Sequence, residues 1–220
     1  MAAMCIGAHL PVSVTARTAS GLIHGQVTIV TRPSRRLSSA GAYPGRTVTV
    51  APPASGSELA NVIVYLELPK GVTSAPRHAT IHQPNVVFVP RVPAVTAGST
   101  VDFPNDDAIF HNVFSLSRGA TFDLGRYPRG ATRSRRFDAP GIVKVFCHLH
   151  SHMTALIRVF DHPYFSQPDA AGRFTIPDVP PGRYRVVAWH ERVGDVTHEA
   201  VVTDGGTVSL SFSLPLTDTP

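Results

Sequence analysis

The sequence predicts an all-β protein, and three observations support this fold class. Strand-like runs of β-branched or alternating residues recur along the chain. Clusters of Gly, Pro, Asp and Ser separate these runs, as expected for turns. Twenty prolines and seventeen glycines in 220 residues leave little room for long helices, and no helical period of useful length is present. Short strands at this spacing are typical of β-sandwiches and β-barrels.

Ten such runs are spread along the chain. In order they cover residues 25–30, 46–51, 61–68, 85–90, 142–147, 155–160, 172–177, 184–189, 198–203 and 207–214. Two segments interrupt them. Residues 31–45 form a polar insertion after the first run, and residues 161–172, with two prolines and a turn signal, indicate a domain boundary.

Composition limits the class of protein. An apolar fraction of 43% provides one large or two small hydrophobic cores. No run of about eighteen apolar residues is present, so we expect no membrane span. Cys5 and Cys147 are the only cysteines, which excludes a disulfide scaffold. Residues 1–20 resemble the tail of a secretory signal, with a candidate cleavage site after Ala16, so we expect a secreted or periplasmic protein.

The positive charge is almost entirely arginine and is concentrated in one segment. Six arginines and one aspartate lie between Arg118 and Arg136, so this segment alone matches the formal net charge of the chain, +5. No helical recognition pattern or aromatic stacking motif accompanies it, which argues against nucleic acid as a partner. The segment is either a solvated loop or a docking surface for an acidic redox partner. The candidate docking residues are Arg126, Arg129, Arg133, Arg135 and Arg136.

Candidate metal ligands gather in two short stretches. Cys147, His150 and Met153 follow one another at intervals of three residues, and His111 lies upstream in an apolar, strand-like stretch. A lone cysteine is usually a buried structural thiol, and a lone histidine is usually a core or surface residue. Together, however, these residues supply the two imidazoles, the thiolate and the weak axial thioether of a blue copper site. Zinc has no need of the methionine.

The other two histidines of this loop are not expected to be ligands. His148 directly follows Cys147 at the end of a strand, where neighbouring side chains point to opposite faces. His152 directly precedes Met153 and is expected to face outward. Both histidines are therefore predicted to be exposed.

Two alternatives to electron transfer stay open. The first is copper handling without redox turnover, on a sandwich that binds a glycan or a protein. The second is a zinc- or copper-dependent hydrolase that uses the alternating histidines of the loop, with Asp106 and Asp107 as the nearest candidate acids or bases. A Cys–His nucleophile pair is also conceivable, but the sequence offers no orienting third group.

The two ligand stretches resemble the cupredoxins, the family of blue copper proteins, over about residues 79–160. The stretch "FPNDDAIFHNV" contains the Phe-x-Asn and His-Asn-Val of the family, with His111 eight residues after Phe103 as in plastocyanin-like members. The stretch "VFCHLHSHM" has the short Cys-x-x-His-x-x-Met spacing of amicyanin-like members. His148 and Leu149 stand where many members carry a hydroxyl residue and a proline.

This resemblance implies a Greek-key sandwich that binds one type 1 copper ion and transfers single electrons, and it implies no enzymatic activity. It places His111 on an earlier strand and the other ligands on one loop near the end of a later strand. It also implies that Asn112 holds the two ligand loops together, with Asn105 beside them. The chain as a whole resembles plastocyanin-like proteins of the methylamine-utilisation type.

The last third of the chain resembles a second family. The stretch "DAAGRFTIPDVPPGRYRVVAWHE" (169–191) is similar to the carboxypeptidase regulatory-like family, a small transthyretin-like (immunoglobulin-like) β-sandwich. Residues 21–70 fit the first strands of that family, and residues 165–216 fit the remainder. We therefore expect the cupredoxin domain, residues 79–160, to be inserted into a single second sandwich.

Overall fold

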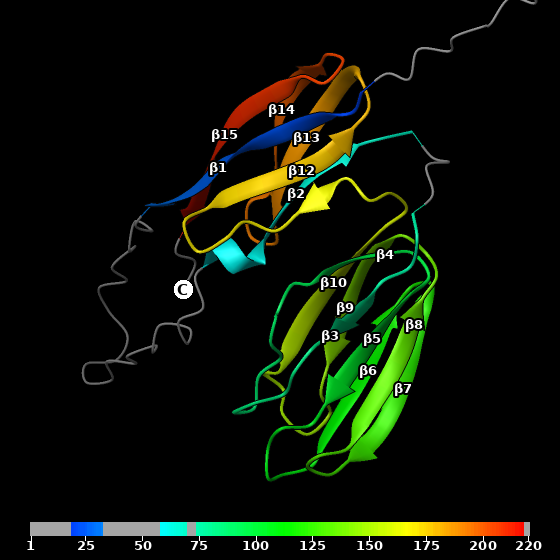
Figure 1. Ribbon diagram of the computed structural model, residues 1–220. Helices are drawn as coiled ribbons and strands as arrows, with labels where there is room; N and C mark the ends of the chain where they lie inside the picture. The colour runs from blue at the N-terminus through cyan, green and yellow to red at the C-terminus, as the bar shows by residue number, and fades with distance from the viewer. Residues whose placement is uncertain (1–18, 33–57, 70–73, 218–220) are drawn as a thin grey trace, which may run out of the picture.

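The computed structural model describes residues 19–32, 58–69 and 74–217 (Figure 1). Within these ranges the chain forms strands and one short 3-10 helix, so the all-β prediction is confirmed. No helix in the described part is long and apolar enough to span a membrane. Most of the leader (1–20), most of the polar insertion (31–45) and the run at 46–51 lie outside the described residues.

Strands from the two ends of the chain form one sandwich, here called the terminal sandwich (residues 19–32, 58–69 and 161–217). Its first sheet has the order β12 (Arg173–Val179), β1 (Gly21–Arg32), β15 (Thr207–Thr217). Its second sheet has the order β11 (Phe165–Ser166), β2 (Val62–Glu67), β13 (Gly182–His190), β14 (Gly194–Val202), and η1 (Glu58–Asn61) precedes β2. The apolar residues of the two inner faces form one core, which includes Ile23, Leu66, Phe174 and Phe212.

The pairing of β1 with β15 joins the two ends of the terminal sandwich. These strands run parallel from Leu22 opposite Thr207 to Arg32 opposite Thr217. In the second sheet, β2 pairs with β13, which runs antiparallel to it and follows more than a hundred residues later in the sequence. The strands before residue 70 therefore pair with strands that follow residue 160.

The middle of the chain forms a second sandwich, here called the central sandwich (residues 74–160). Its larger sheet has the order β4 (Ala94–Thr96), β10 (Thr154–Phe160), β9 (Gly141–Phe146), β6 (His111–Ser117), β7 (Ala120–Tyr127). Its smaller sheet has the order β3 (His78–Thr80), β5 (Ser99–Pro104), β8 (Thr132–Phe137). Alternate residues of β5, including Val101 and Phe103, point into a core of their own.

The run at 85–90 was expected to be a strand, and this prediction is wrong. Asn85 and Val86 have positive φ angles of 51° and 61°, and the segment is a turn with one isolated bridge from Val89 to His82. The N–H groups of Asn85 and Val86 donate to the carboxylate of Asp107, at 2.6 and 2.8 Å. These tertiary hydrogen bonds hold the turn despite its strand-like composition.

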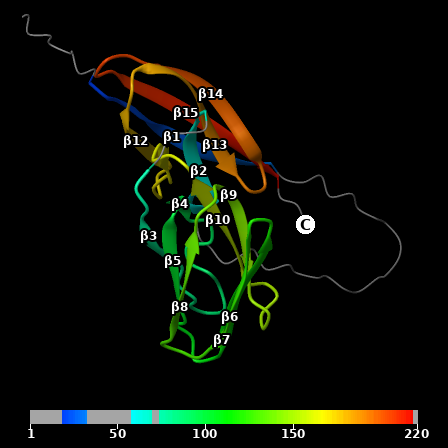
Figure 2. The ribbon, with the colours of Figure 1, turned by 90° about the vertical axis from the view of Figure 1, so that its right-hand side faces the viewer.

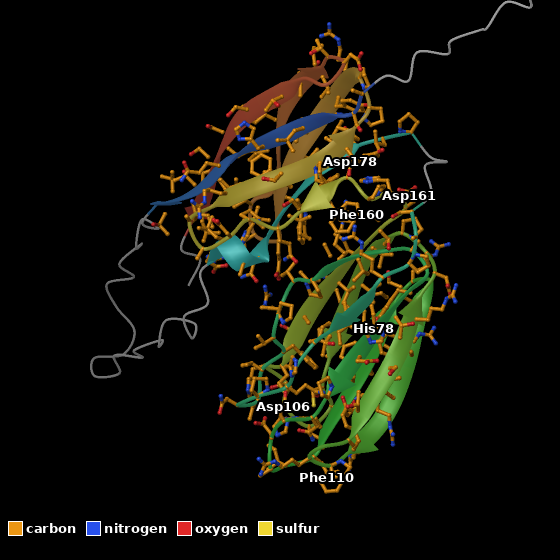
Figure 3. The ribbon with its side chains drawn as sticks, in the orientation of Figure 1. His78, Asp106, Phe110, Phe160, Asp161 and Asp178 are labelled. Atoms are coloured by element: carbon orange, nitrogen blue, oxygen red, sulfur yellow. The ribbon has the colours of Figure 1, made fainter. Side chains whose placement is uncertain are left out.

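The two sandwiches lie end to end (Figure 2). A small buried cluster of apolar side chains joins them. Tyr65 and Trp189 of the terminal sandwich belong to the same buried cluster as Leu156 and Phe160 of β10. The guanidinium of Arg158 lies over the rings of Tyr65, Phe160 and Trp189, at 5.2, 5.3 and 5.7 Å. Figure 3 shows Phe160 and Asp161 at this junction, with Phe110 at the opposite tip of the central sandwich.

Candidate metal centre

Two histidines and the cysteine converge at one end of the central sandwich. The candidate ligand atoms of His111, Cys147 and His150 all lie within 4.8 Å of one another. The Sγ atom of Cys147 is 3.8 Å from Nδ1 of His150, and the rings of His111 and His150 are 5.0 Å apart, with their planes at 70°. The structure thus brings together residues that are 36 positions apart in sequence.

Strand geometry explains this convergence. His111 is the first residue of β6, and Cys147 directly follows the last residue of β9, which is a neighbour of β6 in the same sheet. Phe146 on β9 pairs with Phe114 on β6, so the ends of the two strands are held in register. Residues 147–153 then connect β9 to its antiparallel neighbour β10 in a short loop that carries His150.

The two nitrogens of His111 have different surroundings. Nε2 lies 2.8 Å from Oδ2 of Asp107. Nδ1 is buried and has no hydrogen-bond partner in the described part of the chain. Because buried polar atoms are almost always paired, an unpaired imidazole nitrogen beside a thiol and a second imidazole fits a metal ligand.

Met153 lies in the core of the central sandwich. It is 1% exposed and belongs to the same buried cluster as Cys147. Its backbone N–H donates to the carbonyl of His150 at 3.0 Å, which closes the ligand loop just before β10. The set of two imidazoles, a thiol and a thioether has the donor chemistry that suits copper.

The two asparagines singled out in the sequence are both buried and fix the loops. Asn112 accepts a hydrogen bond from the N–H of His148 and donates to the Asp123 carboxylate, so it ties β6 to the loop that follows β9. Asn105 donates to the carbonyls of Ile109 and Tyr127, at 2.8 and 3.1 Å. Asn105 therefore holds the segment that leads into His111.

The remaining loop histidines lie outside the group of three. The ring of His148 stacks on Phe114, with ring centroids 3.7 Å apart and planes 3° apart, and its Nε2 lies 3.6 Å from Asp123. His152 is exposed, and its ring centroid is 6.4 Å from that of His150. The contacts of His148 could not be predicted from the sequence, because Phe114 and Asp123 belong to β6 and β7.

Burial and neighbouring imidazoles shape the electrostatics of the site. Burial lowers the pKa of His150, and His111 and His152 lower it further, whereas Asp107 raises it. A lowered pKa favours the neutral imidazole, which is the form that binds a metal. Burial also raises the pKa of the nearby Tyr127 to about 12, so this phenol stays neutral within the core.

The two aspartates considered as hydrolytic acids or bases have structural partners. Asp106 lies 3.0 Å from Nδ1 of His82 and accepts from the N–H of Gln83. Burial alone would raise the pKa of Asp107, but hydrogen bonds from Val86, His111 and Asn85 lower it. The role of Asp107 as the partner of His111 was not foreseen from the sequence, although its position four residues before the histidine was the available signal.

The arginines of the basic segment lie on the surface of the central sandwich. All five candidates are exposed, on β7, on β8 and in the turn between them: Arg126, Arg129, Arg133, Arg135 and Arg136. Arg136 pairs with Asp138 at 2.6 Å. Arg133 and Arg135 lie over the rings of Tyr127 and Phe122, at 5.8 and 5.4 Å.

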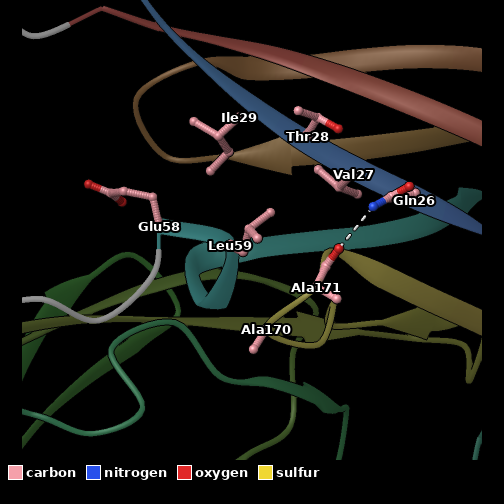
Figure 4. A pocket seen from close by; sticks show the side chains of 8 residues that line it. All are labelled: Gln26, Val27, Thr28, Ile29, Glu58, Leu59, Ala170 and Ala171. Atoms are coloured by element: carbon pink, nitrogen blue, oxygen red, sulfur yellow. Dashed lines mark hydrogen bonds between the residues drawn. The ribbon is translucent and has the colours of Figure 1, made fainter.

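A hollow on the terminal sandwich lacks the features of a site (Figure 4). It lies between β1, η1 and the turn at 170–171, where Nε2 of Gln26 donates to the carbonyl of Ala171 at 3.0 Å. Glu58, the charged residue that lines it, already accepts from Asn61 and pairs with His190. The hollow therefore offers no uncommitted charged group to a ligand.

Comparison with known proteins finds one family model and several similar solved structures. A family model described as polysaccharide lyase family 4, domain II, matches residues 161–210, which lie in the terminal sandwich. No curated protein matches the sequence. The resemblance to the carboxypeptidase regulatory-like family therefore stays a prediction.

Similar solved structures include three copper proteins. A purple cupredoxin from Nitrosopumilus maritimus is 25% identical, and the match covers 37% of this chain and 98% of that chain with a TM-score of 0.34. A copper-containing nitrite reductase from Thermus scotoductus SA-01 is 22% identical, and the match covers 47% of this chain and 26% of that chain with a TM-score of 0.37. A Cu(I) amicyanin variant is 20% identical, and the match covers 37% of this chain and 81% of that chain with a TM-score of 0.35. The chain spans 26% of the nitrite reductase chain. Cupredoxins are thus among the structural neighbours of this chain, over less than half of its length.

Proposed function

We propose that this protein binds one type 1 copper ion and carries single electrons. The ligands are His111, Cys147 and His150, with Met153 as a weak axial ligand. The observation that carries this proposal is the buried, unpaired Nδ1 of His111, beside the thiol of Cys147 and the imidazole of His150. A bound copper ion would supply a one-electron redox couple between its two oxidation states. This ligand set suits both states.

The described residues would keep the ligand positions fixed during electron transfer. His111 begins a strand, Cys147 directly follows one, and Asn112 bonds the backbone that follows Cys147. Close packing around Cys147 and Met153 further limits movement of the loop. Such a rigid site needs little rearrangement when the charge of the metal changes.

The surface around His150 offers a route for the electron. His150 is the partly exposed ligand, whereas His111 and Cys147 are buried. Leu149 and Phe110 are exposed apolar residues on the loops that carry the ligands, at 38% and 55%. We propose that a redox partner docks at this end and that the exposed arginines of β7 and β8 attract an acidic one.

We also propose that the protein acts as a carrier rather than as an enzyme, and outside the cytoplasm. The leader-like composition of residues 1–20 supports export. Both aspartates once considered for hydrolysis accept hydrogen bonds from residues 82–86. No described contact favours hydrolysis over electron transfer.

The test is titration of the purified protein with Cu(II), followed by absorption spectroscopy and voltammetry. We expect an intense blue thiolate-to-copper band that is absent from Cys147→Ser, and a reversible one-electron wave. A colourless protein that binds zinc more tightly than copper would overturn the proposal. Blue protein without a reversible wave would favour copper handling without redox turnover.

A further inference from the structure

Asp107 contacts the buried ligand candidate His111 directly. The two residues are four positions apart, and Oδ2 of Asp107 lies 2.8 Å from Nε2 of His111. His111 is fully buried, and the side chain of Asp107 is only 16% exposed. The carboxylate therefore contacts the imidazole from the side opposite to the unpaired Nδ1.

The carboxylate of Asp107 is itself held in place by backbone groups. The consecutive N–H groups of Asn85 and Val86 donate to its two oxygens, and its own N–H donates to Oδ1 of Asn105 at 3.0 Å. Val86 has a φ of 61°, which is rare for a β-branched residue. Backbone strain of this kind persists only where surrounding contacts fix it, and here the two N–H groups form a small anion-binding turn.

We propose that Asp107 is a positioning residue that holds the proton of His111 on Nε2 and so leaves the Nδ1 lone pair for the metal. A carboxylate accepts hydrogen bonds and donates none, so it favours the tautomer with the proton on Nε2. The opposite tautomer would set two lone pairs against each other at 2.8 Å and leave a buried N–H without a partner. This inference rests on the proposed function, in which Nδ1 ligates copper.

The neighbouring Asp106 provides a matched control. It also bonds the turn, through Nδ1 of His82 and the N–H of Gln83, but it makes no described contact with His111. A general effect of loosening the turn would appear in both Asp106→Asn and Asp107→Asn. An effect that passes through His111 would appear only in Asp107→Asn, because only Asp107 contacts His111. The amide of the new asparagine would set an N–H group against one of the N–H donors that the Asp107 carboxylate accepts from.

The first readout is the protonation of His111 in the full-length, metal-free protein, by long-range proton–nitrogen NMR at neutral pH. We expect the proton on Nε2 in the wild type and in Asp106→Asn, and its loss from Nε2 in Asp107→Asn. The second readout is the affinity for copper, which should fall about 10- to 100-fold in Asp107→Asn and stay unchanged in Asp106→Asn.

Three results would overturn the inference. They are a proton on Nδ1 in the wild type, an unchanged tautomer and affinity in Asp107→Asn, and an equal loss of affinity in both variants. The wild-type tautomer decides the matter even if Asp107→Asn fails to fold. A wild type with the expected tautomer that binds no copper would support the placement of the proton and refute the proposed function, so the two failures are distinguishable.

Discussion

The Sγ atom of Cys147 lies 3.8 Å from Nδ1 of His150, three residues further along the chain. The carbonyl of His150 in turn accepts the N–H of Met153, so the loop folds back on itself within seven residues. Of the three loop histidines, His150 is therefore the one placed beside the thiol, since His148 stacks on Phe114 and His152 is exposed.

The first prediction concerns these three histidines. His150→Ala should abolish the blue band and lower copper affinity by more than about 100-fold, because a direct ligand matters more than an outer-shell partner. His148→Ala and His152→Ala should keep the band. Absorption spectra and copper titration check this, and bleaching by His148→Ala or His152→Ala with retention in His150→Ala would contradict the ligand assignment.

Met153 should tune the redox potential more than it holds the metal. Met153→Leu keeps a similar volume at a residue that is 1% exposed, so its effect on stability should stay below about 1.5 kcal/mol. The protein should stay blue, and its midpoint potential should rise because a donor that favours Cu(II) is lost. Voltammetry checks this; an unchanged potential would mean that Met153 only packs the core.

The exposed arginines should speed reactions with anions. In Arg133→Ala/Arg135→Ala, the rate of oxidation by hexacyanoferrate(III) should fall severalfold at low salt, and the difference should vanish near 1 M salt, where the Debye length is about 3 Å. Stopped-flow measurement checks this. Arg183→Ala/Arg185→Ala, whose arginines pair with glutamates on the terminal sandwich, is the control and should change little.

The strand pairing leads us to propose that the central sandwich interrupts a single terminal sandwich. A fragment of residues 165–220 lacks β1 and β2, so β15 and β13 lose their neighbours. We expect it to be unfolded or aggregated, whereas a fragment of residues 74–160 keeps all its sheet partners. NMR spectra of both fragments check this, and well-dispersed signals from 165–220 would refute the split.

His162 at the junction should make stability depend on pH. Burial lowers its pKa below the usual 6.5; Arg158 also lowers it and Asp161 raises it. The unfolded state therefore binds the proton first as pH falls, so stability is full above about pH 6.5 and is lost as pH falls through the lower pKa of the folded state. Thermal melts between pH 7.5 and 5 should show less pH dependence in His162→Asn, whose side-chain oxygen can replace the acceptor of the Tyr164 N–H. An identical pH dependence in both proteins would show that His162 does not cause it.

The sequence by itself determined the all-β class, and it indicated which residues of one loop are candidate metal ligands. Period-2 alternation and turn residues are local signals, and each strand of the terminal sandwich needs only its own residues to show them. Cys147, His150 and Met153 could be grouped because seven consecutive residues carry all three. The turn at 85–90 escaped this approach because hydrogen bonds to Asp107, 21 and 22 residues away, override its composition.

Only the tertiary structure decided which groups meet across strands. The pairing of β6 with β9 brings His111 to Cys147, and the turn at Asn85 and Val86 sets the carboxylate of Asp107 against Nε2 of His111. The stacking of His148 on Phe114 likewise depends on that strand register. The physical reason is that the local sequence decides to which face of a strand a side chain points. Its neighbours across the sheet depend instead on strand register and on loops formed by distant parts of the chain.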